Sequence, residues 1–298
     1  LNGELSVDGL KLCRMQKNLF VGEIRMGKID CKTLSEDYLN IVKTEIQAKN
    51  AHPILAVITI GEVSAASQAY IRNKQKACER VGIIYQHIAF SAEEDVNSII
   101  SIIEQLNINS QVSGIIVQLP IQHKELNQYE GVKRITSYIS PLKDVDGFNI
   151  NVGGLLYEGF KMYPHGLYPC TALGVYRLLI NEYEGLTGLR GKNVTIIGRS
   201  DLVGKPLSLM LQDADCTVTL CHSKTINLQQ HLQNADIVIS ATGVPGLLED
   251  KLSYCETIVD VGISRTAEGK LCGDISEETK AKYSKRYTPV PGGVGLLT

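Results

Sequence analysis

The sequence predicts a two-domain α/β protein with a parallel sheet in each half. Strand-sized runs rich in β-branched residues alternate with longer amphipathic segments, which is the pattern of βα units. The alternation occurs twice, before and after a zone from Pro141 to Thr171 that contains several Gly and Pro residues. This zone is expected to be a connection rather than core, and the 298 residues suffice for two domains with a core each.

The first half of the chain has the order strand, helix, strand, helix, strand. The expected elements are Ile54–Ile60, Ala65–Val81, Ile83–Ala89, Glu93–Leu106 and Gly114–Val117. Gly82 directly follows the first helix, where a glycine commonly ends a helix. The βαβαβ order predicts parallel strands with helices on both faces of the sheet, and we assign residues 26–168 to this N-terminal domain.

The second half repeats this alternation after a helix that is expected to bridge the two domains. The bridging helix is expected at Thr171–Tyr183, and a short helix at Leu228–Asn234. Strands are expected at Asn193–Ile197, Thr217–Cys221, Ile237–Ser240 and Thr257–Val261. We assign residues 169–298 to this C-terminal domain.

The composition argues against several classes of function. With a net charge of −2, the chain gives no reason to expect nucleic acid or an anionic membrane as a partner, and no apolar run is long enough to span a bilayer. The eight cysteines include no CxxC pair, so we expect reduced thiols in a cytoplasmic protein and no metal site. Residues 1–25 fit neither a signal peptide nor a transit peptide, and we interpret them as a leader or tag-like extension before a start at Met26.

A turn that joins a strand to a helix carries the signal for a dinucleotide. Gly198, Ser200 and Gly204 follow the strand Asn193–Ile197 with the spacing Gly-x-Ser-x-x-x-Gly. Glycines in such a turn let the backbone approach a pyrophosphate, and the start of the next helix presents free N–H groups to it. This spacing is a weaker signal than GxGxxG, so a turn that binds nothing is the alternative.

The end of the next strand indicates which dinucleotide is bound. Enzymes that use NAD usually have an acidic residue here, whereas this strand ends in Cys221-His222-Ser223-Lys224-Thr225. Ser223 and the guanidinium of Arg199 suit a 2′-phosphate, which predicts a Rossmann-like domain that binds NADP. Thr242 and Ile263 follow two further strands, where small turns leave room for a nicotinamide ring; the alternative is that these are ordinary βα turns.

The candidate catalytic residues lie in the first half. Tyr70 and Lys74 are four residues apart on an expected helix and share one face, although such pairs are usually amphipathic surface. A lysine shielded from water can act as a general acid or base, and the uncharged amide of Gln118, after the third strand, can position it. Either Asp144 or Asp146 could bind a polar substrate ring; the alternative is the ordinary turn role of Asp near Gly.

Seven short blocks occur in a fixed order along the chain. They are Ser67–Lys74 (SQAYIRNK), Val117–Pro120 (VQLP), Lys143–Phe148 (KDVDGF), Pro169–Thr171 (PCT), Gly198–Ser200 (GRS), Cys221–Thr225 (CHSKT) and Thr288–Gly295 (TPVPGGVG). In this order they closely resemble the bifunctional methylenetetrahydrofolate dehydrogenase/methenyltetrahydrofolate cyclohydrolase family. The similarity runs from about Met26 to the end of the chain.

This resemblance implies a homodimer of two-domain subunits with a folate-binding cleft between the domains. It implies two reactions of one-carbon metabolism, of the kind that supply purine biosynthesis. Hydride passes from 5,10-methylenetetrahydrofolate to NADP, and water then opens the methenyl cation to 10-formyltetrahydrofolate.

The resemblance also implies roles for individual residues. Lys74 would be the general acid/base and Gln118 would tune it, while Tyr70 would stack on the folate and Asp146 would hold the pterin edge. The NADP site would consist of Gly198, Arg199, Ser200, Gly204, Ser223, Thr242 and Ile263, with Arg199 and Ser223 on the 2′-phosphate. The folate site would further include Val117, Leu119, Pro291, Gly292, Gly293, Val294 and Gly295.

Several departures from the family pattern keep alternatives open. Ala172 replaces the last Pro of Pro-Cys-Thr-Pro, Leu296 and Leu297 replace the Pro-Met of Gly-Val-Gly-Pro-Met-Thr, the turn before Tyr70 is one residue longer, and the chain stops where the family continues into a helix. One alternative is a dehydrogenase without cyclohydrolase activity, and another is a catalytically impaired protein that binds folate or dinucleotide. A third is an NADP-dependent dehydrogenase that acts on a shikimate-type acid.

Overall fold

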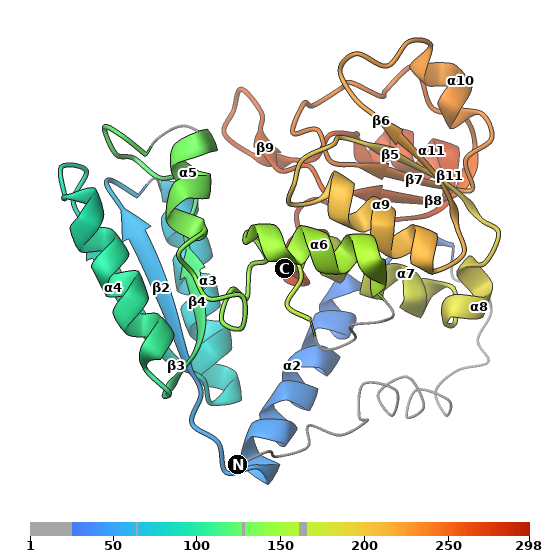
Figure 1. Ribbon diagram of the computed structural model, residues 1–298. Coiled ribbons are helices and arrows are strands. Elements are labelled where there is room, and N and C mark those ends of the chain that lie inside the picture. The colour runs from blue at the N-terminus through green and yellow to red at the C-terminus, as the bar shows by residue number, and fades with distance from the viewer. Residues whose placement is uncertain (1–25, 64, 127–128, 161–165) are drawn as a thin grey trace. The chain divides into compact units, whose positions relative to one another are not determined.

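The computed structural model describes residues 26–63, 65–126, 129–160 and 166–298, so the expected extension at residues 1–25 lies outside the described part of the chain (Figure 1). These residues form two compact units. The first unit comprises residues 33–154 and 167–170, and the second comprises the remaining described residues. The expected boundary at residue 168 lies beside this division. Residues 26–32, 155–160 and 166 belong to the second unit rather than to the first, and residues 169 and 170 belong to the first rather than to the second.

The first unit contains a three-stranded parallel sheet in the order β3-β2-β4, which confirms the predicted βαβαβ pattern. The strands are β2 (Ile54–Ile60), β3 (Ile84–Phe90) and β4 (Val112–Val117). Successive side chains of a strand point to opposite faces. Ile58 belongs to the core on one face of the sheet, whereas its neighbours Val57 and Thr59 are buried on the other face. The central strand is therefore covered on both faces.

Helices flank this sheet. They are α3 (Ala65–Val81), α4 (Val96–Ile108) and α5 (Tyr129–Thr136), and α2 (Cys31–Ala48) precedes them. Ile99 and Ile103 of α4 pack in the same core as Ile135 of α5, and the two helices lie on the same side of the sheet (Figure 1). Helix α4 begins later than expected because Asp95 caps it: its carboxylate accepts a hydrogen bond from the backbone N–H of Ser98 at 3.0 Å.

The segment from Pro141 to Thr171 contains the points at which the chain passes from one unit to the other, as expected of a connection, but it is more structured than expected. It contains helix α6 (Ile150–Gly159), and Asp144 within it is fully buried. Asp144 forms a parallel bridge at the edge of β4, and its carboxylate accepts backbone hydrogen bonds from Gly147 at 3.1 Å and Asn149 at 2.5 Å. A polar turn can be buried when its own backbone N–H groups donate hydrogen bonds to its carboxylate. The hydropathy of the sequence does not reveal such bonds.

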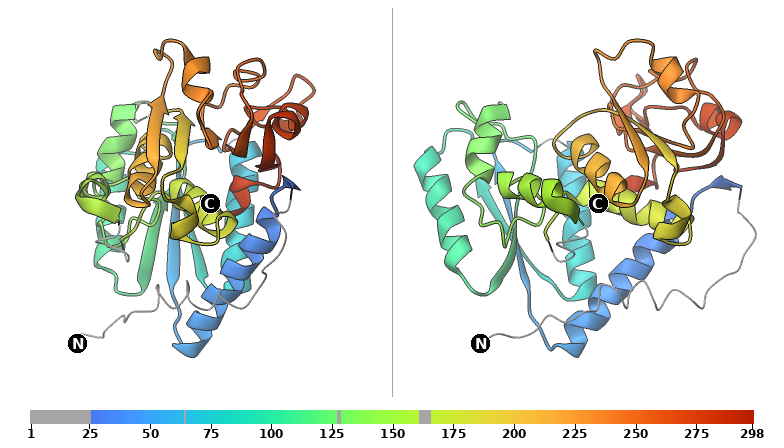
Figure 2. Two further views of the ribbon diagram at one scale, coloured as in Figure 1. Left: turned by 90° about the vertical axis from the view of Figure 1, so that its right-hand side faces the viewer. Right: turned by 45° about the vertical axis from the view of Figure 1, so that its right-hand side comes forward.

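The second unit contains a six-stranded sheet in the order β1-β11-β8-β7-β5-β6, with all adjacent strands parallel. Figure 2 shows the ribbon from two further sides. The strands are β1 (Gly27–Lys28), β5 (Asn193–Ile197), β6 (Thr217–Cys221), β7 (Ile237–Ser240), β8 (Cys255–Asp260) and β11 (Ser284–Tyr287). The chain goes from β5 outward to β6 and then back to β7 on the other side of β5. Such a change of direction is a topological switch point, at which ligands bind beyond the carboxyl ends of the strands.

Helices and two further short strands complete the second unit. They are α7 (Cys170–Glu182), α8 (Leu186–Leu189), α9 (Gly204–Asp213), α10 (Leu228–Leu232), β9 (Ser264–Arg265), β10 (Leu271–Cys272), α11 (Glu277–Tyr283) and the 3-10 helix η3 (Val294–Leu296). The core beneath the sheet includes Val238, Leu248 and Ile258, none of which is exposed. Helix α7 covers the expected bridging segment with boundaries shifted by one residue.

A polar cluster closes the amino edge of the second sheet. The hydroxyl groups of Tyr183 and Thr257 are 2.9 Å apart, and Thr257 is fully buried. Lys192 contacts both carboxylate oxygens of Glu256 at 2.9 Å, and the Arg286 guanidinium lies 4.7 Å from the centre of the Tyr183 ring. These contacts join the segment after α7 to strands β8 and β11, at the edge opposite to the expected ligand site.

The described part of the chain contains no helix long and apolar enough to cross a membrane. Seven cysteines lie within this part, and all of them are free thiols. The described residues also contain no group of three or more His, Cys, Asp or Glu side chains arranged to hold a metal ion.

Candidate active site and dinucleotide site

Lys74 and Gln118 meet at the carboxyl end of β4. The Lys74 Nζ donates a hydrogen bond to Gln118 Oε1 at 3.3 Å, although the two residues are 44 positions apart in the sequence. The Gln118 Nε2 donates to the carbonyl oxygen of Leu119 at 2.9 Å, which turns Oε1 toward the lysine. The amine is half-buried and faces a neutral acceptor, so its charge is oriented without being neutralised.

Tyr70 lies one helical turn before Lys74, as their spacing predicts. Its side chain is 38% exposed, and the remaining burial raises the pKa of the phenol above its usual range. The hydroxyl therefore stays protonated at neutral pH, while part of the ring is open to a ligand. Such a side chain can offer an aromatic surface for stacking.

The two acidic candidates after β4 have different environments. Asp144 is fully buried, and its carboxylate is occupied by the backbone N–H groups of its own turn. Burial raises the pKa of Asp144 despite those hydrogen bonds. Asp146 is only partly buried, so it is the one of the pair that a substrate can reach. This difference in burial favours Asp146 over Asp144 as the candidate.

Cys170 is a residue of this site to which the sequence interpretation assigned no role. Its thiol donates to the carbonyl oxygen of Val145 at 3.0 Å, next to Asp146. Burial, followed by the charge of Asp146, raises the pKa of the Cys170 thiol to about 12. The thiol is therefore a hydrogen-bond donor rather than a nucleophile at neutral pH. The block Pro169-Cys170-Thr171 was the one signal in the sequence that pointed to it.

The glycine turn after β5 is tightly built. Gly198 has a φ of 118°, and its backbone N–H donates to the carbonyl oxygen of Cys221 at 2.9 Å. A Cβ on Gly198 would collide with the backbone of Ala241, and one on Gly204 would collide with the backbone of Gly198. Ser200 receives the backbone N–H of Val203 on its Oγ at 3.2 Å. The turn thus requires glycine at both positions and leads directly into α9.

The end of β6 presents hydroxyl and basic groups, as predicted. The His222 N–H donates to the Thr225 Oγ1 at 2.8 Å, and the Lys224 N–H donates to the His222 Nδ1 at 3.1 Å. These bonds fix the turn, while the side chains of Ser223 and Lys224 are exposed. Arg199, in the neighbouring turn, is exposed as well. The set contains no acid, which fits a 2′-phosphate better than bare ribose hydroxyls.

The turns after β7 and β8 contain the two remaining cofactor candidates. Ile263 is 45% exposed. Thr242 is partly buried, and its hydroxyl donates to Asp274 Oδ2 at 2.9 Å and accepts the Val244 N–H at 3.1 Å. The hydroxyl of Thr242 is therefore engaged within the protein, and a cofactor would meet the backbone or the methyl group.

The segment after β11 carries the candidate substrate loop. Pro291 and Gly292 are exposed, whereas Gly293 and Val294 are buried. The altered end of the chain packs within the same unit: a Cβ on Gly174 of α7 would lie 2.8 Å from the Leu297 carbonyl oxygen. Ala172, the other departure from the family pattern, is fully buried in the first turn of α7.

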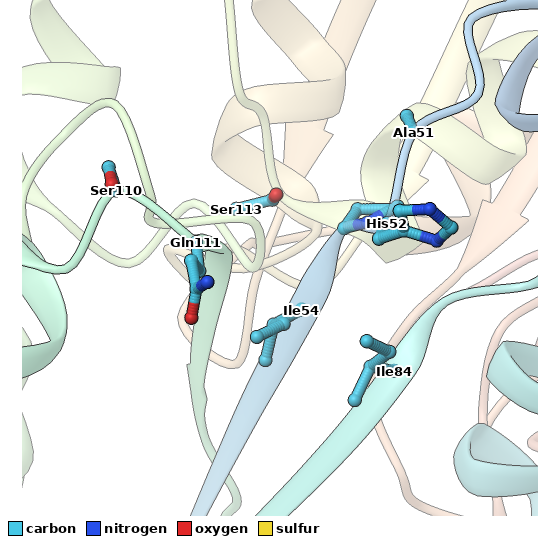
Figure 3. A pocket seen from close by; sticks show the side chains of 8 residues that line it. Ala51, His52, Ile54, Ile84, Ser110, Gln111 and Ser113 are labelled. Carbon is cyan, nitrogen blue, oxygen red and sulfur yellow. The ribbon is translucent and has the colours of Figure 1, made fainter.

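A shallow pocket of about 380 Å³ lies elsewhere, at the amino ends of the three strands of the first sheet (Figure 3). Figure 3 shows His52, Ser110, Gln111 and Ser113 around it, with the apolar side chains of Ile54 and Ile84. No acidic side chain, lysine or arginine lines it. Because Lys74 and Gln118 meet at the other end of β4, this pocket is separate from the candidate active site.

A glycine turn at the switch point of a parallel sheet, followed by a strand that ends in hydroxyl and basic groups, defines a dinucleotide-binding α/β protein. Comparison with family models gives the particular family. Residues 29–146 match the catalytic domain, and residues 169–298 the NAD(P)-binding domain, of tetrahydrofolate dehydrogenase/cyclohydrolase. The chain belongs to this family, which confirms the resemblance seen in the sequence blocks.

Individual relatives agree with this assignment. The chain is 44% identical over 276 residues to the bifunctional protein FolD of Rickettsia rickettsii (strain Sheila Smith), with 91% of each chain covered. It is 38% identical to the FolD methylenetetrahydrofolate dehydrogenase/cyclohydrolase structure from Campylobacter jejuni, with a TM-score of 0.83 and coverage of 91% and 94%. The Trypanosoma brucei enzyme, solved with NADP and an inhibitor, is 28% identical with a TM-score of 0.78 and coverage of 91% and 93%.

Proposed function

We propose that this chain oxidises 5,10-methylenetetrahydrofolate with NADP and then hydrolyses the product to 10-formyltetrahydrofolate. The observation that carries the proposal is the contact between Lys74 and Gln118 in the unit that matches the catalytic domain. Bound NADP would accept a hydride from the methylene carbon, which leaves the methenyl cation. Hydride transfer needs proximity and orientation from the protein rather than an acid or base.

The hydrolysis is the step that requires Lys74. Water adds to the bridging carbon of the cation, the bond from that carbon to N5 breaks, and the formyl group stays on N10. The attacking water gives up two protons: N5 gains one as its bond to carbon breaks, and the other is released to solvent as the formyl carbonyl forms. One group that accepts and returns a proton therefore serves both events. Lys74 Nζ, held by Gln118 Oε1, is placed for this role. A carboxylate in place of Gln118 would hold the amine in its charged form.

The remaining residues of the first unit would bind the folate. The exposed part of the Tyr70 ring offers a surface on which the pterin can stack. Asp146 can accept hydrogen bonds from the amino group and ring N–H of the pterin, since Asp144 is occupied. Val117 and Leu119 flank Gln118 and would line the same site. We extend the folate-binding role to the loop Pro291–Gly295 of the second unit, on the basis of the family pattern.

The second unit would bind NADP. Gly198, Ser200 and Gly204 would receive the pyrophosphate at the start of α9. The side chains of Arg199 and Ser223, both exposed at the carboxyl edge, would hold the 2′-phosphate. Thr242 and Ile263 would lie beside the nicotinamide ring.

We further propose that the protein is a cytoplasmic homodimer. Strand β3 is the outer strand of the first sheet, and Ile84 on it is 51% exposed. An outer strand with exposed apolar residues readily pairs with a second copy. Free thiols at all seven described cysteines support a reducing compartment. Light scattering tests the dimer: a monomer at micromolar concentration would contradict it.

The alternative of a dehydrogenase without cyclohydrolase activity is less well supported, because Lys74 and Gln118 are both present and in contact. Two assays on one preparation separate the alternatives. The first follows NADPH absorbance after methylenetetrahydrofolate and NADP are mixed, and the second follows the loss of methenyltetrahydrofolate absorbance without NADP. Activity in both supports the bifunctional enzyme, whereas activity in the first alone supports the alternative. Activity in neither supports the impaired homologue.

A further inference from the structure

Three buried charged side chains lie beneath the carboxyl edge of the second sheet. Asp260, Asp274 and Lys280 are 1%, 0% and 1% exposed, and the proposed chemistry uses none of them. Charged groups are expensive to bury unless they are paired or hydrogen-bonded. The partners of these three residues therefore show which parts of the fold they hold in place.

Asp274 holds the turn after β7. Its Oδ2 accepts three hydrogen bonds: from the Ser240 Oγ at 2.7 Å, from the Thr242 backbone N–H at 2.8 Å and from the Thr242 Oγ1 at 2.9 Å. The Thr242 Oγ1 in turn accepts the Val244 N–H at 3.1 Å. One carboxylate oxygen thus determines the conformation of the turn that contains Thr242.

The same carboxylate is also in contact with the turn after β8. A side chain on Gly262 would collide with the Asp274 carboxylate, so the two residues are packed directly together. Asp260 Oδ1 accepts the backbone N–H of Gly262 at 3.1 Å and that of Asp274 at 3.0 Å. The turn that carries Ile263 is therefore fixed relative to Asp274.

Lys280 connects these turns to the segment after β11. Its Nζ donates to the Thr288 carbonyl oxygen at 3.0 Å and lies 3.5 Å from Asp260 Oδ2. The Thr288 Oγ1 accepts the Asp260 backbone N–H at 2.8 Å. Three successive loops at the ligand edge thus share one buried polar cluster.

We propose that Asp274 is a positioning residue for the nicotinamide half of the dinucleotide site, which it controls through Thr242 and Gly262 without touching the cofactor. This inference rests on the proposed function, because it requires NADP at this edge. The turn proposed for the 2′-phosphate of the adenosine half is held by other contacts, including the bond from the His222 N–H to the Thr225 Oγ1 at 2.8 Å. Loss of Asp274 should therefore affect the two halves of the cofactor unequally.

Two probes measure the halves separately. Adenosine 2′,5′-bisphosphate contains the 2′-phosphate but no nicotinamide, whereas NADP contains both. Calorimetric titration of the full chain gives the dissociation constant of each. We expect Asp274→Ala to weaken NADP binding about tenfold or more, because Ser240 and the turn that contains Thr242 lose three hydrogen bonds to one side-chain oxygen. Adenosine 2′,5′-bisphosphate should bind within about twofold of wild type.

Two further variants keep the outcome interpretable. Asp274→Asn preserves the shape of the side chain and supplies a neutral acceptor. We expect it to weaken NADP binding less than Asp274→Ala does. If the alanine variant does not fold, the asparagine variant tests the inference in its place. Thr257→Val removes a buried hydroxyl contact at the opposite edge of the sheet and should change neither probe.

Three results would overturn the inference. The first is unchanged NADP binding in the Asp274 variants, and the second is an equal loss of both probes, which indicates general disruption of the unit. The third is a wild-type protein that binds neither probe, which refutes the proposed cofactor as well.

Discussion

Gln118 presents its carbonyl oxygen to Lys74 at 3.3 Å because its own amide nitrogen is bound to the Leu119 carbonyl oxygen at 2.9 Å. The backbone of the next residue, Leu119, thereby fixes the orientation of the Gln118 side-chain amide. A lysine held by a neutral partner can take up and return a proton, which a lysine paired with a carboxylate does less readily.

Replacement of Gln118 by Glu tests this relationship. The new carboxylate would stabilise the charged amine, so we expect cyclohydrolase activity to fall by about tenfold or more and its pH profile to move to higher pH. Rates of methenyltetrahydrofolate hydrolysis between pH 6 and pH 9 measure both effects. An unchanged rate and profile would show that the neutral amide is not required. Gln111→Glu, a change of the same kind at the opposite end of β4, is the control.

Arg199→Ala tests the choice of cofactor. Loss of a guanidinium from a 2′-phosphate should lower kcat/KM for NADP by about 10- to 100-fold, with little effect on NAD. The ratio of kcat/KM for the two cofactors reports this directly. Lys205→Ala removes a nearby exposed cation that is paired with Asp201 at 2.6 Å, and it should leave the ratio unchanged. An equal fall for NADP and NAD would place Arg199 away from the 2′-phosphate.

Gly198→Ala tests the tight turn after β5. The φ of 118° disfavours any side chain, and the added Cβ would collide with Ala241. We expect NADP binding to be lost and the free energy of unfolding to fall by about 1–3 kcal/mol. Gly269→Ala is a matched control, because Gly269 has a φ of 79° but open space around it. It should carry only the conformational cost and bind NADP normally.

The pair of Lys192 and Glu256 predicts how stability changes at acidic pH. Burial acts to raise the pKa of Glu256, but the hydrogen bond and charge of Lys192, together with smaller contributions from Tyr183 and Lys285, lower the pKa below the ordinary value of 4.5. A lowered folded-state pKa stabilises the protein above about pH 4.5 and ceases to do so as the pH falls through the folded-state value. Glu256→Gln should therefore be less stable than wild type at pH 7, with a smaller difference at pH 4.

Urea unfolding at the two pH values measures that difference. A gap between wild type and Glu256→Gln that widens toward pH 4 would contradict the assigned direction of the pKa shift. Glu104→Gln is a control for a change of net charge, since Glu104 is exposed on helix α4.

The regular part of the fold could be predicted from sequence because its signals are local. Strands β2 and β5 and helix α3 have the expected boundaries, because the strands are short runs rich in β-branched residues, the helix is an amphipathic run, and a glycine follows each of them. Strand β11 was not predicted, because its residues Ser284–Tyr287 include a lysine and an arginine, which are typical of an exposed segment. Strand β11 pairs with β8, whose residues are distant in sequence, and local periodicity does not report such a pairing.

The candidate site residues that lie in a sequence motif could be predicted. Contacts and buried charges that depend on the folded structure could not. Tyr70 and Lys74 follow from helical spacing, whereas the contact of Lys74 with Gln118 needs the fold to bring β4 beside α3. The buried Lys280 lies in a helix whose sequence, EETKAKY, is typical of a solvated surface. Nothing in that sequence indicates that one of its two lysines is enclosed.

The most direct measurement of the central claim compares wild type with Lys74→Met in the two assays. The proposal predicts that wild type reduces NADP with methylenetetrahydrofolate and hydrolyses methenyltetrahydrofolate. Lys74→Met should lose about 10²- to 10⁴-fold in the hydrolysis and still reduce NADP. Lys76→Met, on another face of α3, should resemble wild type in both assays. Hydrolysis at the wild-type rate by Lys74→Met would contradict the assignment of Lys74 as the general acid/base.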